Sequence, residues 1–269
     1  MAAKKILFIS QEIMPYLPET ELSNIGRYLP QGIQERGKEI RTFMPRYGCI
    51  NERRNQLHEV IRLSGMNLII DDTDRQLIIK VASIQAARMQ IYFIDNEDYF
   101  HRKEIVEDKD GKVFEDNDER QLFFARGVFE TVRKLNWSPD LIYCQGWFTS
   151  FVPLILKKEY HDDPLFANTK VIYSACNDNF EGEIDKRCVE KLVNSNISEK
   201  DVEILKDPTF VNINKVAIDF SDGVIINHTD VLDEVKTYAT ESKKPVTTYC
   251  TKETYIDNYN SFFDQVLES

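Results

Sequence analysis

The apolar and polar positions of the first 45 residues follow two different periods. Residues 4–10 (KKILFIS) form a near-continuous apolar run, which is typical of a parallel strand covered on both faces. From Leu22 to Arg36 the apolar residues recur at helical spacing, and Gly37 follows as the expected C-terminal cap. Residues 39–45 (EIRTFMP) supply a second strand. This order predicts the right-handed crossover unit from which doubly wound sheets are built.

The next part of the chain has strand-like runs that follow one another without a good helix between them. These runs are HEVIRL at 58–63, MNLIID at 66–71, QLIIKVASI at 76–84 and MQIYFID at 89–95. We therefore expect hairpins inserted beside the main sheet.

Alternation of helices and strands resumes with a helix predicted over Asn117–Leu135, which has an apolar face and an acidic first turn. Further strands are expected at 140–144, 170–175, 223–227 and 245–250, and further helices near 149–158, 185–194, 209–219, 229–239 and 252–267. The fold class is therefore α/β. We predict a single doubly wound, Rossmann-like domain over residues 1–269, in which residues 251–269 return as a C-terminal helix packed on the sheet.

Composition and charge narrow the range of partners. No apolar run approaches the roughly 20 residues of a membrane-spanning helix, and the N-terminus turns polar too early for a secretory signal, so we expect a cytoplasmic protein without membrane contact. A net charge of −11 disfavours nucleic-acid binding, which needs clustered Lys and Arg. A neutral ligand or a protein partner fits this charge better.

Cysteine usage and the acidic segment give no metal site. The five cysteines are widely spaced and contain no CxxC pair, so neither a disulfide framework nor a zinc site is expected. The DKDGK stretch within 95–119 fails the EF-hand spacing. Cys144 and Cys176 follow predicted strands, where open α/β sheets bind ligands, but neither has a histidine nearby in sequence, and we expect buried structural thiols.

Six segments, in this order, resemble the N-terminal half of the bacterial glycogen synthase and plant starch synthase family. Residues 4–16 (KKILFISQEIMPY) resemble its "KILFVSSEIAPF", 44–48 its "MPRYG", 115–127 (EDNDERQLFFARG) its "DNAERFAFFSRA", 136–153 (NWSPDLIYCQGWFTSFVP) its "GWRPDVVHCHDWHTGLVP", 174–182 (SACNDNFEG) its "TIHNLAYQG", and 219–227 (DFSDGVIIN) its "YADKVTTVS". The resemblance covers roughly residues 4–235. It implies the N-terminal lobe of the GT-B fold, an ADP-glucose donor and an α-1,4-glucan acceptor.

The family's "KTGGL" loop after the first strand is replaced here by residues 18–22 (PETEL). A diphosphate leaving group needs positive charge and backbone N–H groups directed at its oxygens. In this chain a proline stands at the lysine position, both glycines are gone, and Glu19 and Glu21 would repel an anion. We interpret the stretch as a polar loop that caps the following helix through Thr20 or Ser23.

The family's histidines are also replaced. In the "HCHDWH" segment their positions hold Tyr143, Gln145 and Phe148, and the "HN" histidine is Cys176. The four histidines of the chain (His58, His101, His161 and His228) fall on no family motif and are expected at the surface. Because amides cannot titrate near neutrality, we assign no catalytic residue.

Six positions that match the family remain candidates for a ligand-binding cleft: Glu12, Arg46, Tyr47, Gln145, Trp147 and Asn177. Gln145 and Asn177 can hydrogen-bond a sugar hydroxyl. Glu12, Arg46 and Tyr47 have an equal alternative role, which is to brace the strand ends.

Two hypotheses about function stay open. In GT-B enzymes the donor nucleotide binds mainly to a second lobe, and only about 30 residues follow residue 235, where the resemblance ends. Residues 254–267 (TYIDNYNSFFDQVL) resemble the family's returning helix. The first hypothesis is a pseudoenzyme without a cofactor that binds an α-glucan or malto-oligosaccharide, or regulates a protein partner. The alternative is an active glycosyltransferase of glycogen synthesis whose donor site is completed by another chain or by a homodimer.

Overall fold

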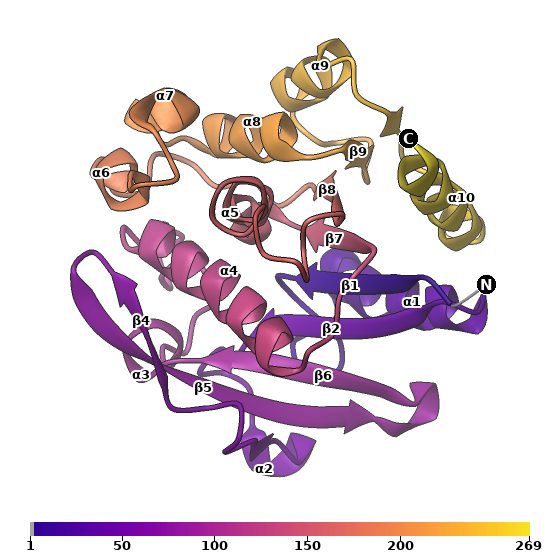
Figure 1. The fold of residues 1–269 in the computed structure, drawn as a ribbon, viewed down its shortest axis with the longest axis horizontal. Helices are drawn as coiled ribbons and strands as arrows, with labels where there is room; N and C mark the ends of the chain where they lie inside the picture. Colours follow the sequence, from indigo (N-terminus) through magenta and orange to yellow (C-terminus); the bar gives the residue numbers. More distant parts are fainter. Residues whose placement is uncertain (1–2) are drawn as a thin grey trace.

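The computed structural model describes residues 3–269, and its strands form a ten-stranded sheet at the centre of the molecule (Figure 1). The sheet order is β10-β9-β8-β7-β1-β2-β6-β5-β3, and β4 pairs with β5. The strands are β1 (Lys5–Ser10), β2 (Glu39–Pro45), β3 (His58–Glu59), β4 (Met66–Ile70), β5 (Thr73–Ile84), β6 (Met89–Asp95), β7 (Leu141–Gln145), β8 (Lys170–Ala175), β9 (Gly223–Ile226) and β10 (Val246–Thr247).

The seven strands from β10 to β6 pair in parallel, with β1 at the point where the strand order reverses. Ile6 of β1 aligns with Ile40 of β2 on one side and with Leu141 of β7 on the other. These strands are apolar runs because helices cover both of their faces. The predicted doubly wound α/β class is confirmed.

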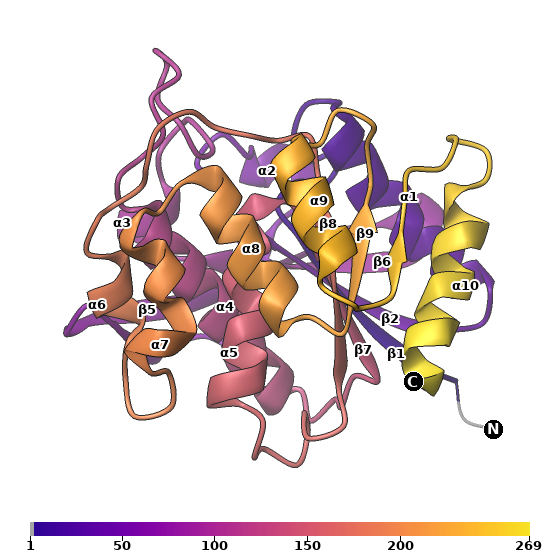
Figure 2. The ribbon, with the colours of Figure 1, turned by 90° about the horizontal axis from the view of Figure 1, so that it is seen from above.

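The helices form two layers, one on each face of the sheet (Figures 1 and 2). One layer contains α4 (Asn117–Lys134), α5 (Phe151–Glu159) and α8 (Phe210–Phe220), and the other contains α1 (Glu21–Glu35) and α10 (Tyr255–Glu268). The remaining helices are α2 (Glu52–Asn55), α3 (Glu97–Phe100), α6 (Cys188–Leu192), α7 (Glu199–Val202) and α9 (Asp233–Glu241), with short 3-10 turns η1 (Gln85–Ala87), η2 (Trp147–Thr149) and η3 (Glu203–Lys206). No helix among residues 3–269 is both long and apolar enough to cross a bilayer.

The hairpin region extends the main sheet instead of lying beside it. Strand β6 pairs in parallel with β2, so the run at 89–95 belongs to the central sheet. Strands β5 and β6 form a long antiparallel hairpin, and β4 folds back antiparallel on β5. Of the run at 58–63, His58 and Glu59 pair with β5. The hairpins were predicted, but their continuity with the sheet was not, because periodicity does not say which strand is a neighbour.

The C-terminal helix α10 packs back on the sheet beside α1, as the fold prediction requires. Two glycines allow this close approach: a Cβ on Gly32 of α1 would lie 2.6 Å from Cγ2 of Ile256, and one on Gly223 of β9 would lie 2.9 Å from Cγ2 of Val266. A buried cluster of α10 side chains, including Phe263, then covers the β1, β7 and β9 side chains of this face. The end of α1 is tied to α10 by an ion pair of Arg36 with Asp257.

Candidate functional site

A cleft lies where β1, β7 and β8 end, at the edge of the sheet where doubly wound folds bind their ligands. Its volume is ≈ 280 Å³, and we call it the strand-end cleft. Its lining residues are Gln11, Glu12, Thr20, Glu21, Leu22, Val106, Glu107, Trp147, Asn177, Asp178, Asn179 and Phe180.

The charge of the strand-end cleft has one sign. Four carboxylates line it, from Glu12, Glu21, Glu107 and Asp178, and its lining contains no Lys or Arg. Burial raises the pKa of Glu12, although the hydroxyl of Thr20, which donates to the carboxylate over 2.9 Å, opposes that rise. The cleft is therefore a poor place for an anion and a good acceptor of hydrogen bonds from hydroxyl groups.

Asp178 lines the strand-end cleft and was not among the residues that the sequence analysis singled out. Its Oδ2 accepts the backbone N–H of Trp147 over 2.9 Å, while its Oδ1 is buried without a hydrogen-bond partner. Burial raises the pKa of Asp178 to about 7, and the nearby charge of Glu12 contributes to the rise. The sequence did contain a signal for this residue. Asp178 directly follows Asn177, at a motif position where the quoted family segment has leucine.

Comparison with known proteins places the chain in a family. The family model described as "Starch synthase catalytic domain" matches residues 5–245. The chain belongs to this starch synthase catalytic domain family. It is 35% identical over 195 residues to the glycogen synthase of Chlorobium luteolum and 34% identical over 195 residues to that of Chlorobium limicola. Each alignment covers 72% of this chain and 40% of the relative, so the chain spans about 40% of the length of these curated relatives.

Solved structures show the same fold at low sequence identity. The catalytic domain of starch synthase IV from Arabidopsis thaliana, bound to ADP and acarbose, matches with a TM-score of 0.74 and 15% identity. The match covers 94% of this chain and 53% of that one. A sucrose-phosphate synthase structure from Thermosynechococcus elongatus matches with a TM-score of 0.54 and 12% identity, covering 98% of this chain and 99% of that one. The ten-stranded sheet is thus of the GT-B type found in starch synthases.

The loop at the starch synthase "KTGGL" position is used here to begin a helix. The backbone N–H of Ser23 donates to Oγ1 of Thr20 over 3.0 Å, and the N–H of Thr20 donates to Oγ of Ser23 over 2.9 Å. This reciprocal pair caps α1 and occupies two donors that an anion at this end of the helix would otherwise use.

Three of the six predicted cleft residues line the strand-end cleft. Asn177 is exposed there, Glu12 is partly buried, and Trp147 is buried with its ring centroid 4.6 Å from that of Phe180. Gln145 is fully buried, and its amide donates to the carbonyl of Leu22 over 3.0 Å. Gln145 therefore joins β7 to the start of α1 and is not placed to contact a ligand.

Arg46 and Tyr47 are not among the residues that line the strand-end cleft. Arg46 is ion-paired with Glu52 and lies 3.9 Å from the buried carboxylate of Asp95. Lys80 joins the same network, 2.9 Å from Asp95. Tyr47 is completely buried, and this burial raises the pKa of its phenol. Both residues brace the end of β2, which is the alternative that the sequence left open.

Neither buried cysteine is suited to act as a nucleophile. Cys144 and Cys176 are free thiols, and burial raises the pKa of each well above its usual value. Cys176 is held by a hydrogen bond from the amide of Asn227 over 2.8 Å. Since the thiolate is the reactive form, both cysteines are structural.

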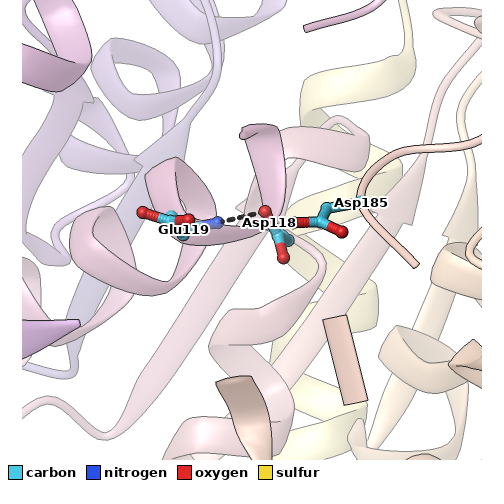
Figure 3. Close-up of side chains that lie close together, drawn as sticks. All are labelled: Asp118, Glu119 and Asp185. Atoms are coloured by element: carbon cyan, nitrogen blue, oxygen red, sulfur yellow. Dashed lines mark hydrogen bonds between the residues drawn. The ribbon is translucent and has the colours of Figure 1, made fainter. Parts of the chain in front are cut away.

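The closest grouping of potential metal ligands within residues 3–269 consists of Asp118, Glu119 and Asp185 (Figure 3). The ammonium of Lys191 lies among them, at 2.7 Å from Glu119, 2.7 Å from Asp185 and 3.1 Å from Asp118. Burial raises the pKa of Asp118 to about 7 even though Lys191 opposes the rise. A lysine thus takes the position of a cation, and the cluster joins α4 to the segment around α6.

Proposed function

We propose that this chain binds a neutral α-glucan, as the acceptor lobe of a glycogen or starch synthase-like protein, and that it does not transfer glucose from ADP-glucose on its own. The observation that carries the proposal is the strand-end cleft, whose lining has four carboxylates and no cationic side chain.

The argument against a donor rests on charge. The transition state of glucosyl transfer develops negative charge on the leaving diphosphate, and enzymes stabilise it with cations and fixed N–H groups. Burial raises the pKa of Glu12 and of Asp178, and the charge of Glu12 adds to the rise at Asp178. An additional anion in this cleft would face the same loss of water and the same repulsion. The capping pair of Thr20 and Ser23 removes N–H groups from use as well.

The argument for a glucan rests on hydrogen bonding and on family membership. The hydroxyl groups of a sugar donate to carboxylates without adding charge, and the amide of Asn177 is exposed to pair with a further hydroxyl. Membership of the starch synthase catalytic domain family supports the choice of an α-linked glucose polymer over other neutral sugars.

Isothermal titration tests this proposal with three ligands: ADP-glucose, ADP and maltotetraose. We expect heat of binding with maltotetraose and none with either nucleotide. Micromolar binding of ADP-glucose would contradict the proposal and would favour an enzyme whose donor site is completed by another chain. A lack of binding to all three would contradict the glucan assignment and favour a protein ligand.

A further inference from the structure

A second and larger cavity is lined by residues of α1, of α10 and of the chain that leads into α10, and α1 and α10 lie beside each other (Figures 1 and 2). Its volume is ≈ 830 Å³, against ≈ 280 Å³ for the strand-end cleft. We call it the tyrosine cavity, because Tyr28, Tyr249, Tyr255 and Tyr259 all line it. Only the larger cavity falls within the range of about 300–1,000 Å³ that is typical of ligand sites.

Two of these tyrosines keep exposed aromatic surface, although the guanidinium of Arg27 lies over the ring of Tyr28, 5.2 Å from its centroid. Tyr28 on α1 and Tyr249 after β10 keep 45% and 38% of their surface exposed. The other two tyrosines lie on α10: Tyr259 is 1% exposed, and the partly buried Tyr255 has its ring centroid 5.7 Å from that of Tyr259. The cavity is therefore lined by both exposed and buried aromatic rings from distant parts of the chain.

The polar groups of the tyrosine cavity include two carboxylates, Glu19 and Glu21. Glu19, just before α1, accepts a hydrogen bond from the amide of Asn24 in the first turn of that helix over 3.2 Å. Nδ1 of His228 accepts the backbone N–H of Asp230 over 2.9 Å, so the proton of the neutral ring lies on Nε2, 3.3 Å from the carboxylate of Glu21. Two carboxylates and several neutral polar groups thus surround the aromatic surface.

The balance of charge decides which class of ligand fits. Glu19 and Glu21 oppose a phosphate or a carboxylate, and Lys252 is the one lysine or arginine in the lining. A purely apolar ligand would remove water from the exposed carboxylates of Glu19 and Glu21 without offering them a hydrogen bond, which costs free energy. A neutral ring with many hydroxyl groups satisfies both requirements, because its C–H face meets the negative face of an aromatic ring while its hydroxyls donate to the carboxylates.

We propose that the tyrosine cavity is the site at which this chain holds a neutral oligosaccharide, with sugar rings stacked on Tyr28 and Tyr249 and hydroxyl groups bonded to Glu19 and Asn24. The inference rests on the proposed function, because it names the place of glucan binding. The tyrosine cavity shares Thr20 and Glu21 with the strand-end cleft, so the inference extends the glucan site of the proposed function beyond that cleft.

The test is titration of maltotetraose into the full chain and into two variants, Tyr28→Ala and Tyr249→Ala. Each variant is expected to bind about tenfold more weakly, which corresponds to about 1.4 kcal/mol. Tyr249→Phe keeps the ring and is expected to bind within about threefold of the unaltered chain, or about 0.7 kcal/mol. Ile69→Ala is the matched control, since Ile69 is 63% exposed on β4, away from the cavity, and its removal should leave the affinity unchanged.

Failure of this inference can be told apart from failure of the proposed function. If the unaltered chain binds maltotetraose and both alanine variants bind it equally well, the tyrosine cavity is not the site. Loss of affinity in Asn177→Ala under those conditions would place the glucan in the strand-end cleft. If the unaltered chain does not bind maltotetraose at all, the proposed function and the inference both fail. Because Tyr28 and Tyr249 are largely exposed, their removal should not unfold the chain, which circular dichroism checks.

Discussion

At the residue scale, buried charges determine what each part of the molecule can hold. Lys191 is the clearest case, because its side chain is 2% exposed and its ammonium is surrounded by three carboxylates. Without that ammonium the cluster would be a group of uncompensated anions, of which Asp118 is also 2% exposed. Burial is tolerated here because every charge has a partner of opposite sign.

Replacing Lys191 with methionine is therefore expected to destabilise the fold strongly. Lys191→Met keeps most of the aliphatic stem and removes the charge, leaving Asp118, Glu119 and Asp185 to repel one another. Loss of one partner from a buried ion pair costs about 3–5 kcal/mol. The free energy of unfolding in urea at neutral pH measures this cost.

The control for this change is Lys206→Met. Lys206 also contacts two carboxylates, Glu199 at 3.0 Å and Glu203 at 3.5 Å, but its side chain is 54% exposed. Its loss should change the free energy of unfolding by less than about 1 kcal/mol. Equal stability of the two variants would show that the buried cluster does not depend on its cation.

Residue types in the sequence were a good guide to what the cleft lacks and a poor guide to which residues line it. The absent lysine and histidines were visible in the motifs, and the structure shows the resulting acidic lining. The positions of Arg46 and Tyr47 were not visible, because the turn after β2 carries both side chains into the protein. The role of Asp178 depends on the N–H of Trp147, a contact between segments 31 residues apart that no local pattern encodes.

At the element scale, the docking of α10 depends on the close approach of two helices. Gly32 lies on α1 where Ile256 of α10 presses against the backbone, and an added Cβ would come within 2.6 Å of Cγ2 and 2.9 Å of Cδ1 of that isoleucine. In an isolated helix, alanine would be more stable than glycine by about 1 kcal/mol. At residue 32 the close contact with α10 therefore favours glycine, whereas helix propensity favours alanine.

We therefore expect the effect of Gly32→Ala on the free energy of unfolding to change sign when Ile256 is also replaced. Gly32→Ala alone should lower the free energy of unfolding by about 1–3 kcal/mol, because the packed side chain has to move. In the Ile256→Ala background the obstructing atoms are absent, and the same Gly32→Ala change should raise the free energy of unfolding by up to about 1 kcal/mol. Urea unfolding of the four proteins in the cycle gives both values.

The outcome that contradicts the close approach is additivity. If Gly32→Ala has the same effect with isoleucine and with alanine at residue 256, the two residues do not interact, and α10 is packed less closely than described.

Most helices and strands could be predicted from the sequence, but which of them contact one another could not. The strands at 39–45 and 170–175 were predicted with the bounds found in the structure. Helix α6 is shorter than the expected 185–194, because it ends at Leu192 before an extended residue, Val193. The tyrosine cavity could not be predicted at all, because its walls come from residues about 200 positions apart that meet only through the docking of α10.

At the scale of the whole molecule, α1 and α10 cover one face of the sheet over β1, β7, β8 and β9, opposite the layer that contains α4, α5 and α8 (Figure 2). Phe263 of α10 packs on Phe8 of β1 and Tyr143 of β7, with ring centroids 6.2 Å and 5.6 Å apart. Strands β1 and β7, which carry these two residues, both lie in the middle of the sheet. That residues 1–269 behave as one cooperative unit stays a prediction, and it depends on this contact.

Removing α10 is accordingly expected to destabilise the entire domain. A chain that ends at Cys250 would expose the rings of Phe8 and Tyr143, which are 0% and 1% exposed in the intact protein. Losing a single large core side chain costs about 3–5 kcal/mol, and this deletion also removes Tyr259, Phe262 and Val266 from the core. Since domains are typically stable by only about 5–15 kcal/mol, we expect aggregation on size exclusion and rapid proteolysis throughout the chain. A chain that ends at Leu267 is the control, because the two residues it lacks are exposed, and it should match the full chain in both assays. Solubility and protease resistance that are unchanged on ending at Cys250 would show that the sheet is stable without its returning helix, and that α10 serves mainly to form the tyrosine cavity.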